Sequence, residues 1–500
     1  MNAAPGTSSS QAAAERQVED SARALARSGG WGLVLALVVA ATAARLAYLW
    51  WFCPYGLVED EAYYWLWSKH LDWSYLTKGP GVALTIAAGT LVGGDTEAGV
   101  RLTAPLWGAL LAIGVAGAAA EVVRPERRAR ARLWGAGIAL LSPPMQATSL
   151  LMTIDGPMLA CWSLGTWWAV RALVGRGTWA WLGLGAAIGA GLLFKPTIGV
   201  LGLGVGVALL GSGLGWWRTD LAHAWRRWAL AGAGLAVLGL LPVAIWNAQH
   251  EWALLRHLGE HLRAEGGTDS PGLLRRAGWM GEYLGLQALL GGPPLVLGLA
   301  AALRSRHRSA LESDLPRGLS MLLCASLPVY LLYLAVSMAT RVEGNWALGG
   351  LVPMLSLCAA GAAMGRGGLW THGVRATVVV GVVTGLGSLR LDLFEGALGR
   401  FAPVGRLMSG PRVAAGAERL ADEIGPGTML IADHYGVASQ LAFYLPGRRV
   451  GCSSGASGGR ATQFDLWADT RLDGSAALGS AAVLVGGRMG LWSMAFERVE

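Results

Sequence analysis

The chain has 500 residues, of which 53% are hydrophobic and only 14% are charged, and its mean hydropathy is +0.44. This composition is typical of a polytopic membrane protein and excludes a set of soluble domains of ordinary polarity. The net charge of +8 does not indicate nucleic-acid binding, because the arginines gather in short clusters between apolar runs, where they determine topology. We therefore expect no nucleic-acid partner.

The first 30 residues are polar and rich in alanine and serine, with arginines shortly before the first apolar run. They are too hydrophilic for the apolar region of a secretory signal. We expect residues 1–30 to form a disordered cytoplasmic tail.

Apolar stretches long enough to cross a bilayer, which takes roughly 20 residues, recur from residue 31 to residue 389. We predict an α-helical membrane domain over 31–389 with about 11 transmembrane helices. The expected spans are 31–52, 99–123, 133–152, 156–173, 178–194, 198–217, 228–246, 279–303, 318–338, 346–364 and 376–389.

The arginine clusters predict the orientation of these spans. With a cytoplasmic N-terminus, the inside loops are all rich in arginine, as the positive-inside rule requires. These loops are 124–132, 171–176, 218–227, 304–317 and 366–375. The outer segments then include 53–97, 153–155, 195–197, 247–278, 339–345 and everything after about residue 390, and they contain all three lysines.

The first outer loop, 53–97, contains two apolar stretches, 62–73 and 81–92, that are too short to cross a bilayer. We expect both to form helices that lie on the membrane surface. Their aromatic residues suit the membrane–water interface, where amphipathic rings are favoured. These residues are Trp65, Trp67, Trp73 and Tyr75.

After residue 390 the character of the sequence changes. Residues 428–433, 448–452 and 481–485 have the pattern of short buried strands, and 437–444 that of an intervening helix. We predict a small extracytoplasmic α/β domain over 390–500.

Three acids are candidate catalytic residues. Asp60 and Glu61 precede a run of aromatic residues, so partial burial would adjust their pKa values for work as a base. The alternative is that they only mark the hydrated end of a span. Asp155 stands at the turn between two spans and would serve as the N-cap of the following helix, as a functional acid, or as both.

Several cations are candidate ligands for phosphate. Lys78 and Lys195 each lie close to a proline in an outer segment, and a lysine ammonium is a good point-charge partner for phosphate. Snorkelling of the side chain toward the interface would also explain both positions. Arg101 lies near the outer start of the second span, where either explanation holds.

The outer segment 247–278 contains His257 and His261 at helical spacing, with Glu260 beside them. This pattern is compatible with a metal site or a phosphate site, and equally with a solvated helix face. No cofactor is required by the sequence, and a divalent metal remains an option held by Glu260 and His261. Further candidates for phosphate or sugar contacts are Arg263, Arg341 and Asn345.

Seven segments taken in order resemble one family, although each segment alone is weakly specific. They are VEDEAYYWLWSKHLDWSYLTKGPGVA with the downstream GVRLTAPLWG, then TIDGPML, LLFKPTIGVL, PVAIWNAQHEW, EGNWALGGLVP and ADHYGVASQLAFYL. Together they resemble the GT-C superfamily of polyprenyl-phosphate-sugar glycosyltransferases, of the family 39 type that includes protein O-mannosyltransferases and lipid A aminoarabinose transferases.

The resemblance implies a GT-C fold in a bacterial inner membrane, with the active site on the extracytoplasmic side. It implies a hexosyl or pentosyl transferase whose donor is a polyprenyl-phosphate sugar and whose acceptor is a hydroxyl of a lipid, glycan or protein. Asp60 matches the general base and Asp155 the acid of the second outer loop, whereas Lys78 matches a phosphate-binding lysine of only some relatives. Glu260 and His261 resemble a Glu-His pair found in the aminoarabinose transferases.

The expected reaction is one inverting displacement, in which Asp60 deprotonates the acceptor hydroxyl as it attacks the anomeric carbon. The alternative function is a lipid or sugar transporter or flippase. A transporter is expected to have polar sites near the middle of the membrane, whereas the acids and lysines of this chain gather at one face.

Overall fold

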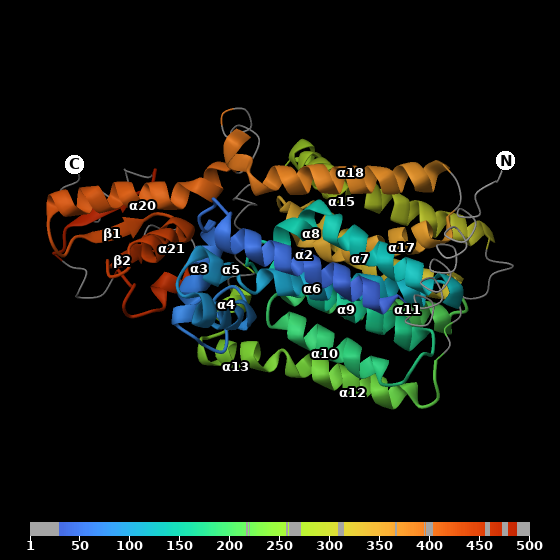
Figure 1. Ribbon diagram of the computed structural model, residues 1–500. Helices are drawn as coiled ribbons and strands as arrows, with labels where there is room; N and C mark the ends of the chain where they lie inside the picture. Colours follow the sequence, from blue (N-terminus) through green and yellow to red (C-terminus); the bar gives the residue numbers. More distant parts are fainter. Residues whose placement is uncertain are drawn as a thin grey trace, which may run out of the picture.

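The computed structural model describes residues 30–216, 219, 221–256, 259, 272–308, 315–365, 368–394, 396, 404–455, 461–472 and 479–487. Almost all of this part of the chain is helical, and the helices form an elongated bundle with a small α/β unit at one end (Figure 1). The predicted tail, 1–30, lies outside the described residues except for Gly30.

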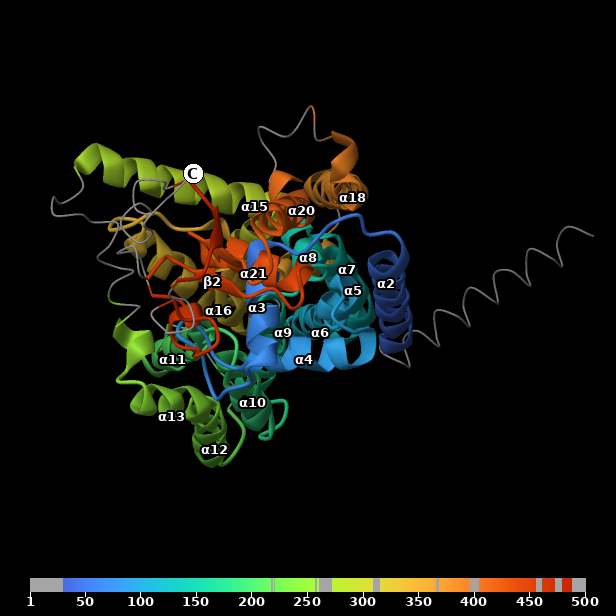
Figure 2. The same cartoon turned by 90° about the vertical axis from the view of Figure 1, so that its left-hand side faces the viewer.

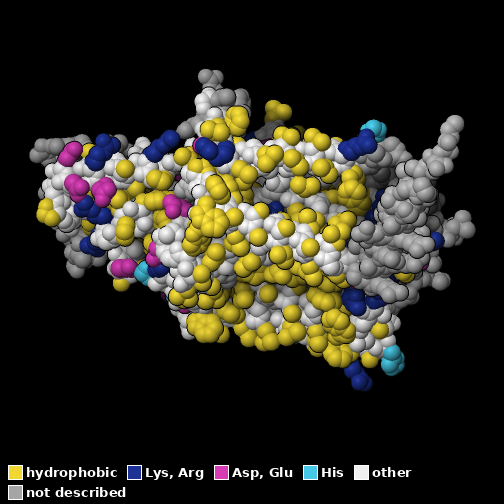
Figure 3. Space-filling model, viewed as in Figure 1, with side chains coloured by type: hydrophobic (Ala, Val, Ile, Leu, Met, Phe, Trp, Pro, Cys, Tyr) yellow, Lys and Arg dark blue, Asp and Glu magenta, His cyan; other side chains and the backbone are white. Residues whose placement is uncertain are grey.

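Eight helical segments among the described residues are long and apolar enough to cross a membrane. Hydrophobic side chains cover the long face of the bundle seen in Figure 3, whereas acidic side chains gather toward the α/β unit. The bundle helices are α2 (Trp31–Trp51), α5 (Glu97–Arg101), α6 (Ala104–Glu121), α7 (Arg128–Leu141), α8 (Pro143–Thr148), α9 (Asp155–Leu173), α10 (Ala180–Leu192), α11 (Gly199–Gly213), α12 (Trp225–Leu238), α13 (Leu241–Gln249), α15 (Leu273–Arg308), α16 (Leu315–Val336), α17 (Leu348–Met364) and α18 (Gly368–Leu389).

The predicted helical membrane protein is confirmed. Each predicted span falls on one or two of these helices. The helices at 133–152, 156–173 and 178–194 are, however, not among the eight segments of the described chain that are long and apolar enough to cross, so the count of about 11 stays a prediction.

Three spans are divided, and the first of them, 99–123, is formed by α5 and α6. The 133–152 stretch breaks into α7 and α8 at Pro143, because proline lacks the N–H that would continue the helix. The 228–246 stretch breaks into α12 and α13 just before Pro242. Helix α15 bends at Gly292, whose φ of 49° is accessible mainly to glycine.

The core of the bundle lies around α17, which is buried along almost its whole length. Helices α6, α7, α9, α15 and α16 surround it, and α6 and α9 form the most extensive helix–helix contact among the described elements. Small residues allow this close approach. At Gly114, a methyl group would lie 2.3 Å from the Ser163 hydroxyl, so the α6–α9 contact depends on a residue without a side chain.

The first outer loop contains α3 (Glu59–Lys69) and α4 (Gly81–Gly93), which correspond to the two short helices predicted there. Three of the four aromatic residues expected at the membrane–water interface are packed inside the protein instead. Trp65, Trp67 and Tyr75 are all buried, and only Trp73 of the four predicted interfacial aromatics is exposed. The reason is that the C-terminal α/β unit covers the outer side of α3.

The C-terminal unit is a three-stranded parallel sheet with helices packed on it. The strands are β1 (Met429–Ala432), β2 (Val450–Cys452) and β3 (Ala482–Val485) in the order β2-β1-β3. Helix α20 (Val404–Ile424) packs against β1, β3 and α21 (Tyr435–Tyr444), and α21 leads from β1 toward β2. The predicted strands and the predicted helix are therefore present, and α20 is an addition.

Helix α21 lies directly against α3, as the view along the bundle shows (Figure 2). The Gln440 side chain donates to the Leu57 carbonyl at 2.8 Å, and the Leu57 N–H donates to the Tyr444 hydroxyl at 2.7 Å. The Gln463 N–H donates to the Tyr63 hydroxyl at 2.7 Å. The first outer loop is thus held between the membrane bundle and the C-terminal unit.

Candidate active site

The first turn of α3 places two neighbouring acids in different environments. Val58 is extended and precedes the helix, and its N–H donates to Glu61 Oε2 at 3.2 Å. A glutamate at this third position is a common helix-start device. The return of Glu61 toward the helix start buries its carboxylate completely, whereas Asp60, one residue earlier, is exposed to solvent.

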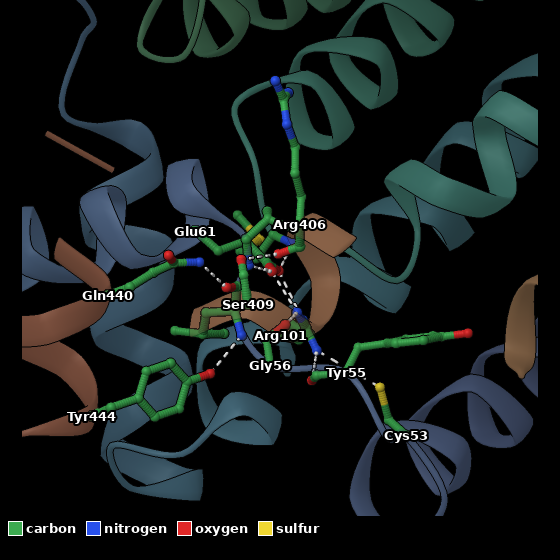
Figure 4. Close-up of polar contacts among 12 residues, drawn as sticks. Cys53, Tyr55, Gly56, Glu61, Arg101, Arg406, Ser409, Gln440 and Tyr444 are labelled. Carbon is green, nitrogen blue, oxygen red and sulfur yellow. Dashed lines mark hydrogen bonds and ion pairs between the residues drawn. The ribbon is translucent and has the colours of Figure 1, made fainter. Parts of the chain in front are cut away.

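Glu61 forms a buried ion pair with Arg101 (Figure 4). The Arg101 Nε and Nη2 atoms donate to the two carboxylate oxygens at 2.8 Å and 2.5 Å. The remaining arginine donors bind the carbonyls of Tyr55 and Gly56 and the Cys53 sulfur. Both side chains are at most 1% exposed.

This arrangement changes the interpretation of both residues. Glu61 also accepts the Met152 N–H at 2.8 Å, so its oxygens are occupied by Arg101 and by two backbone donors. Arg101 has all its donors engaged and has no access to a phosphate in solvent. Sequence reasoning had no means to find the pair, because the two residues are separated by 40 positions. We assign Glu61 and Arg101 to holding the loop in place, and not to contacting substrate.

Asp60 is the acid that remains accessible. The Tyr435 hydroxyl, from the start of α21, donates to Asp60 Oδ1 at 3.2 Å. The surrounding protein raises the pKa of Asp60 by desolvation, and the negative charge of Asp155 raises it further. The hydrogen bond from Tyr435 and the positive charge of Lys78 lower this pKa and partly offset the rise.

Asp155 is held by two partners from distant parts of the chain. Lys195 Nζ donates to Oδ1 at 2.9 Å, and Asn345 Nδ2 donates to Oδ2 at 2.7 Å. The N-cap prediction for Asp155 is wrong, because the residue is the first of α9 and Ile154 occupies the cap without a side-chain bond. Through these two hydrogen bonds, the carboxylate instead connects the start of α9 to the segment before α11 and to the segment before α17.

Lys78 contributes a cation without a fixed partner. Its Nζ makes no hydrogen bond or ion pair within the described part of the chain, whereas Lys195 is paired with Asp155. Burial lowers the pKa of Lys78 to about 8, and the charge of Lys195 adds to this effect. The next residue, Gly79, packs so closely on α10 that a methyl group would lie 2.4 Å from the Leu193 carbonyl oxygen. This contact fixes the backbone beside Lys78.

The structure therefore brings together five of the predicted residues. The charges of Lys78 and Asp155 act on the pKa of Asp60, and those of Lys195, Asp155 and Asp60 act on the pKa of Lys78. Asn345 binds Asp155 directly. The assembly combines the accessible carboxylate of Asp60, the ammonium of Lys78 and the ion pair of Asp155 with Lys195. Such a set suits proton abstraction next to a bound anion.

The other predicted residues are not part of this cluster. Arg341 forms an exposed ion pair with Glu282. Glu260, His261 and Arg263 lie outside the described residues, as does His257. Within the described ranges, no group of three His, Cys, Asp or Glu side chains is placed to hold a metal ion.

Three further residues at the site carried no predicted role. Tyr435 binds Asp60, and the Thr197 and Tyr333 hydroxyls are 3.0 Å apart close to Lys195. Tyr435 belongs to ADHYGVASQLAFYL, one of the seven segments that carry the family resemblance. Its contact with Asp60 could not be predicted, because the two residues are far apart in the sequence. Neither tyrosine has a local sequence signal that would distinguish it from a packed aromatic residue.

Comparisons with known proteins show which family and which solved structures this chain resembles. Residues 77–246 match the family described as dolichyl-phosphate-mannose-protein mannosyltransferase. This match includes Lys78, Asp155 and Lys195 and begins after Asp60. The chain is also 26% identical over 300 residues to a lipid A galacturonosyltransferase, RgtD, of Rhizobium johnstonii. That alignment covers 58% of this chain and 57% of the relative.

Two crystal structures of ArnT from Cupriavidus metallidurans share the fold. The apo structure matches with a TM-score of 0.56 at 17% identity, over 88% of this chain and 87% of ArnT. The structure of ArnT bound to undecaprenyl phosphate matches with a TM-score of 0.58 at 18% identity, over 85% and 86% of the two chains. The resemblance to family 39-like GT-C glycosyltransferases is confirmed.

The cluster around Asp60 lies where the bundle meets its C-terminal unit. The site is built from α3, the loop before α4, the start of α9, the segment before α11 and the segment before α17. Together with the start of α21, which contributes Tyr435, six separate parts of the chain have to fold before the site exists.

Proposed function

We propose that this protein is an inverting membrane glycosyltransferase, which moves a hexose or pentose from a polyprenyl-phosphate donor to a hydroxyl acceptor. The acceptor hydroxyl belongs to a lipid, a glycan or a protein. The reaction takes place on the outer face of the cytoplasmic membrane, opposite the side to which the positive-inside rule assigns the arginine-rich loops.

One observation carries the assignment of the base. Of the three predicted catalytic acids, Glu61 and Asp155 have both carboxylate oxygens bound by other groups, whereas Asp60 has only Tyr435 on Oδ1. Within the described part of the chain, Asp60 Oδ2 has no hydrogen-bond partner. A base must accept a proton from its substrate, and Asp60 has the oxygen to do so.

Lys78 is the counterpart of Asp60 on the leaving-group side. The phosphate of a polyprenyl-phosphate sugar leaves with its negative charge, and a partly buried ammonium stabilises that charge more strongly than one in bulk water. Lys195 already neutralises Asp155, so Lys78 is the cation that an incoming phosphate would pair with. Asp155, fixed by Lys195 and Asn345, would orient the acceptor.

The long apolar surface of the bundle suits a lipid-linked donor. Undecaprenyl phosphate is bound by ArnT in one of the similar structures, and the two folds match over most of their lengths. In this chain the polar cluster lies at one end of the apolar helices, so a polyprenyl chain could remain in the bilayer while its phosphate reached Lys78. This arrangement supports a lipid-phosphate donor and leaves the sugar open.

The direct test is a transfer assay with the purified protein in lipid nanodiscs and a set of undecaprenyl-phosphate sugars. We expect free undecaprenyl phosphate to appear together with a glycosylated acceptor when cell-envelope lipids or proteins are supplied. Movement of the intact donor between leaflets of proteoliposomes, without cleavage of the sugar-phosphate bond, would contradict the proposal and favour a transporter.

Lys78 provides a prediction about alkaline pH. Because its pKa in the free protein is about 8, the ammonium charge is present below that pH and is lost as pH rises through it. We expect kcat/KM for the donor to fall above about pH 8, since kcat/KM reports groups of the free enzyme. In Lys78→Arg the alkaline fall should disappear, because arginine stays charged.

The control for this prediction is Lys69→Arg, which replaces a lysine of the same loop that pairs with Asp95. Its alkaline limb should equal that of the wild-type protein. An alkaline limb that persists unchanged in Lys78→Arg would show that another group causes it.

A further inference from the structure

The C-terminal unit contributes a side chain to the cluster. Tyr435 is the first residue of α21, and its hydroxyl reaches across the domain boundary to Asp60 Oδ1 at 3.2 Å. Its ring lies against Tyr63, with ring centroids 4.6 Å apart, and the preceding His434 lies 3.9 Å from Glu59. The tyrosine is thus fixed by contacts on both sides of the carboxylate it binds.

The packing of α21 against α3 holds the Tyr435 hydroxyl next to Asp60. Gln440 and Tyr444, on later turns of α21, bind the backbone of Leu57, which lies two residues before the start of α3. The Gln463 side chain accepts the Leu76 N–H at 3.0 Å from a separate part of the C-terminal unit. These bonds fix the position of α21 independently of Tyr435, so the Tyr435 hydroxyl is not needed to dock the helix.

The charged and titratable groups around Asp60 come from several elements. Glu59 and Tyr64 belong to α3, Lys78 to the loop that follows it, Asp155 to α9, Lys195 to the segment before α11, and His434 and Tyr435 to the C-terminal unit. Tyr435 is the group among them that hydrogen-bonds Asp60 directly in the described structure.

We propose that Tyr435 is a positioning residue for the catalytic carboxylate, and that the C-terminal unit thereby completes the active site. This inference rests on the proposed function, in which Asp60 is the base. The Tyr435 hydroxyl holds Oδ1 and stabilises the ionised carboxylate, which leaves Oδ2 directed toward the acceptor hydroxyl. During the reaction, the acceptor proton moves to Asp60 Oδ2 while the new glycosidic bond forms and the bond to phosphate breaks.

Removal of the Tyr435 hydroxyl should change the pKa of Asp60 in a direction that follows from the hydrogen bond. A hydrogen bond donated to a carboxylate favours its charged form and lowers its pKa, so Tyr435→Phe raises the pKa of Asp60. The base must be ionised to act, so the acidic limb of the kcat/KM profile should move to higher pH by about one unit, the usual size for a hydrogen bond to a charged group. At the plateau the variant should keep most of its activity.

A second variant tests the opposite direction without changing the shape of the side chain. Replacing Tyr435 with 3-fluorotyrosine makes the phenol a stronger hydrogen-bond donor. The acidic limb should then move to lower pH than in the wild-type protein. This variant also covers the case in which Tyr435→Phe does not fold.

Tyr444→Phe is the matched control, because it removes a hydroxyl from the same helix and from the same interface but does not touch Asp60. Its acidic limb should stay at the wild-type pH. An unshifted limb in Tyr435→Phe and in the fluorotyrosine protein, or an equal shift in Tyr444→Phe, would overturn the inference. If Asp60→Asn is inactive in the same assay, such a result would leave the proposed function standing, whereas an active Asp60→Asn would contradict the function itself.

Discussion

Asp60→Asn is expected to reduce sugar transfer by about 10²- to 10⁴-fold, which is the usual contribution of a general base. Asparagine keeps the size of the side chain and can still accept the Tyr435 hydroxyl, but it cannot take a proton from the acceptor. Because Asp60 is exposed and makes one hydrogen bond, the variant should fold as the wild-type protein does. Transfer to a hydroxyl acceptor at saturating donor is the measurement.

Glu59→Gln is the control, because it removes the adjacent carboxylate of the same helical turn. Glu59 lies near His434 and influences Asp60 only through its charge. Its replacement should change transfer by much less than that of Asp60. Full activity in a folded Asp60→Asn protein would exclude Asp60 as the base.

Glu61→Gln is expected to act on stability. It leaves the Arg101 guanidinium fully buried without its counter-charge, and breaking a buried pair in this way costs about 3–5 kcal/mol. The free energy of unfolding in detergent, or the apparent melting temperature where unfolding is irreversible, should fall accordingly. Activity should be lost together with the fold of the first outer loop.

An exposed ion pair of the same chain offers the contrast. Arg341 and Glu282 are 60% and 34% exposed, and exposed pairs contribute at most about 1 kcal/mol. Glu282→Gln should therefore have little effect on stability. A folded Glu61→Gln protein with wild-type stability and greatly reduced transfer would contradict the structural role and return Glu61 to the catalytic residues.

The membrane architecture could be predicted because it depends on local properties. Runs of apolar residues and arginine-rich loops are visible in short windows, and the same holds for the strands of the C-terminal unit. Breaks at Pro143 and Pro242 were less visible, because proline within an apolar run is compatible with a continuous membrane helix.

The candidate site could be predicted only in part. Residue type and outer location singled out Asp60, Lys78, Asp155 and Lys195, which the structure places together. The same reasoning could not separate Asp60 from Glu61, because the difference arises from the pairing of Glu61 with Arg101. The burial of α3 and the contact of Tyr435 with Asp60 both depend on a unit that begins more than 300 positions later.

The anomeric configuration of the product tests the central claim, a single displacement assisted by one base. Of the three predicted catalytic acids, Glu61 and Asp155 have both carboxylate oxygens bound by other groups, so neither is placed to form a covalent sugar intermediate. A donor of defined configuration should give a product of the opposite configuration, measured by nuclear magnetic resonance. A product with the configuration of the donor would contradict the account.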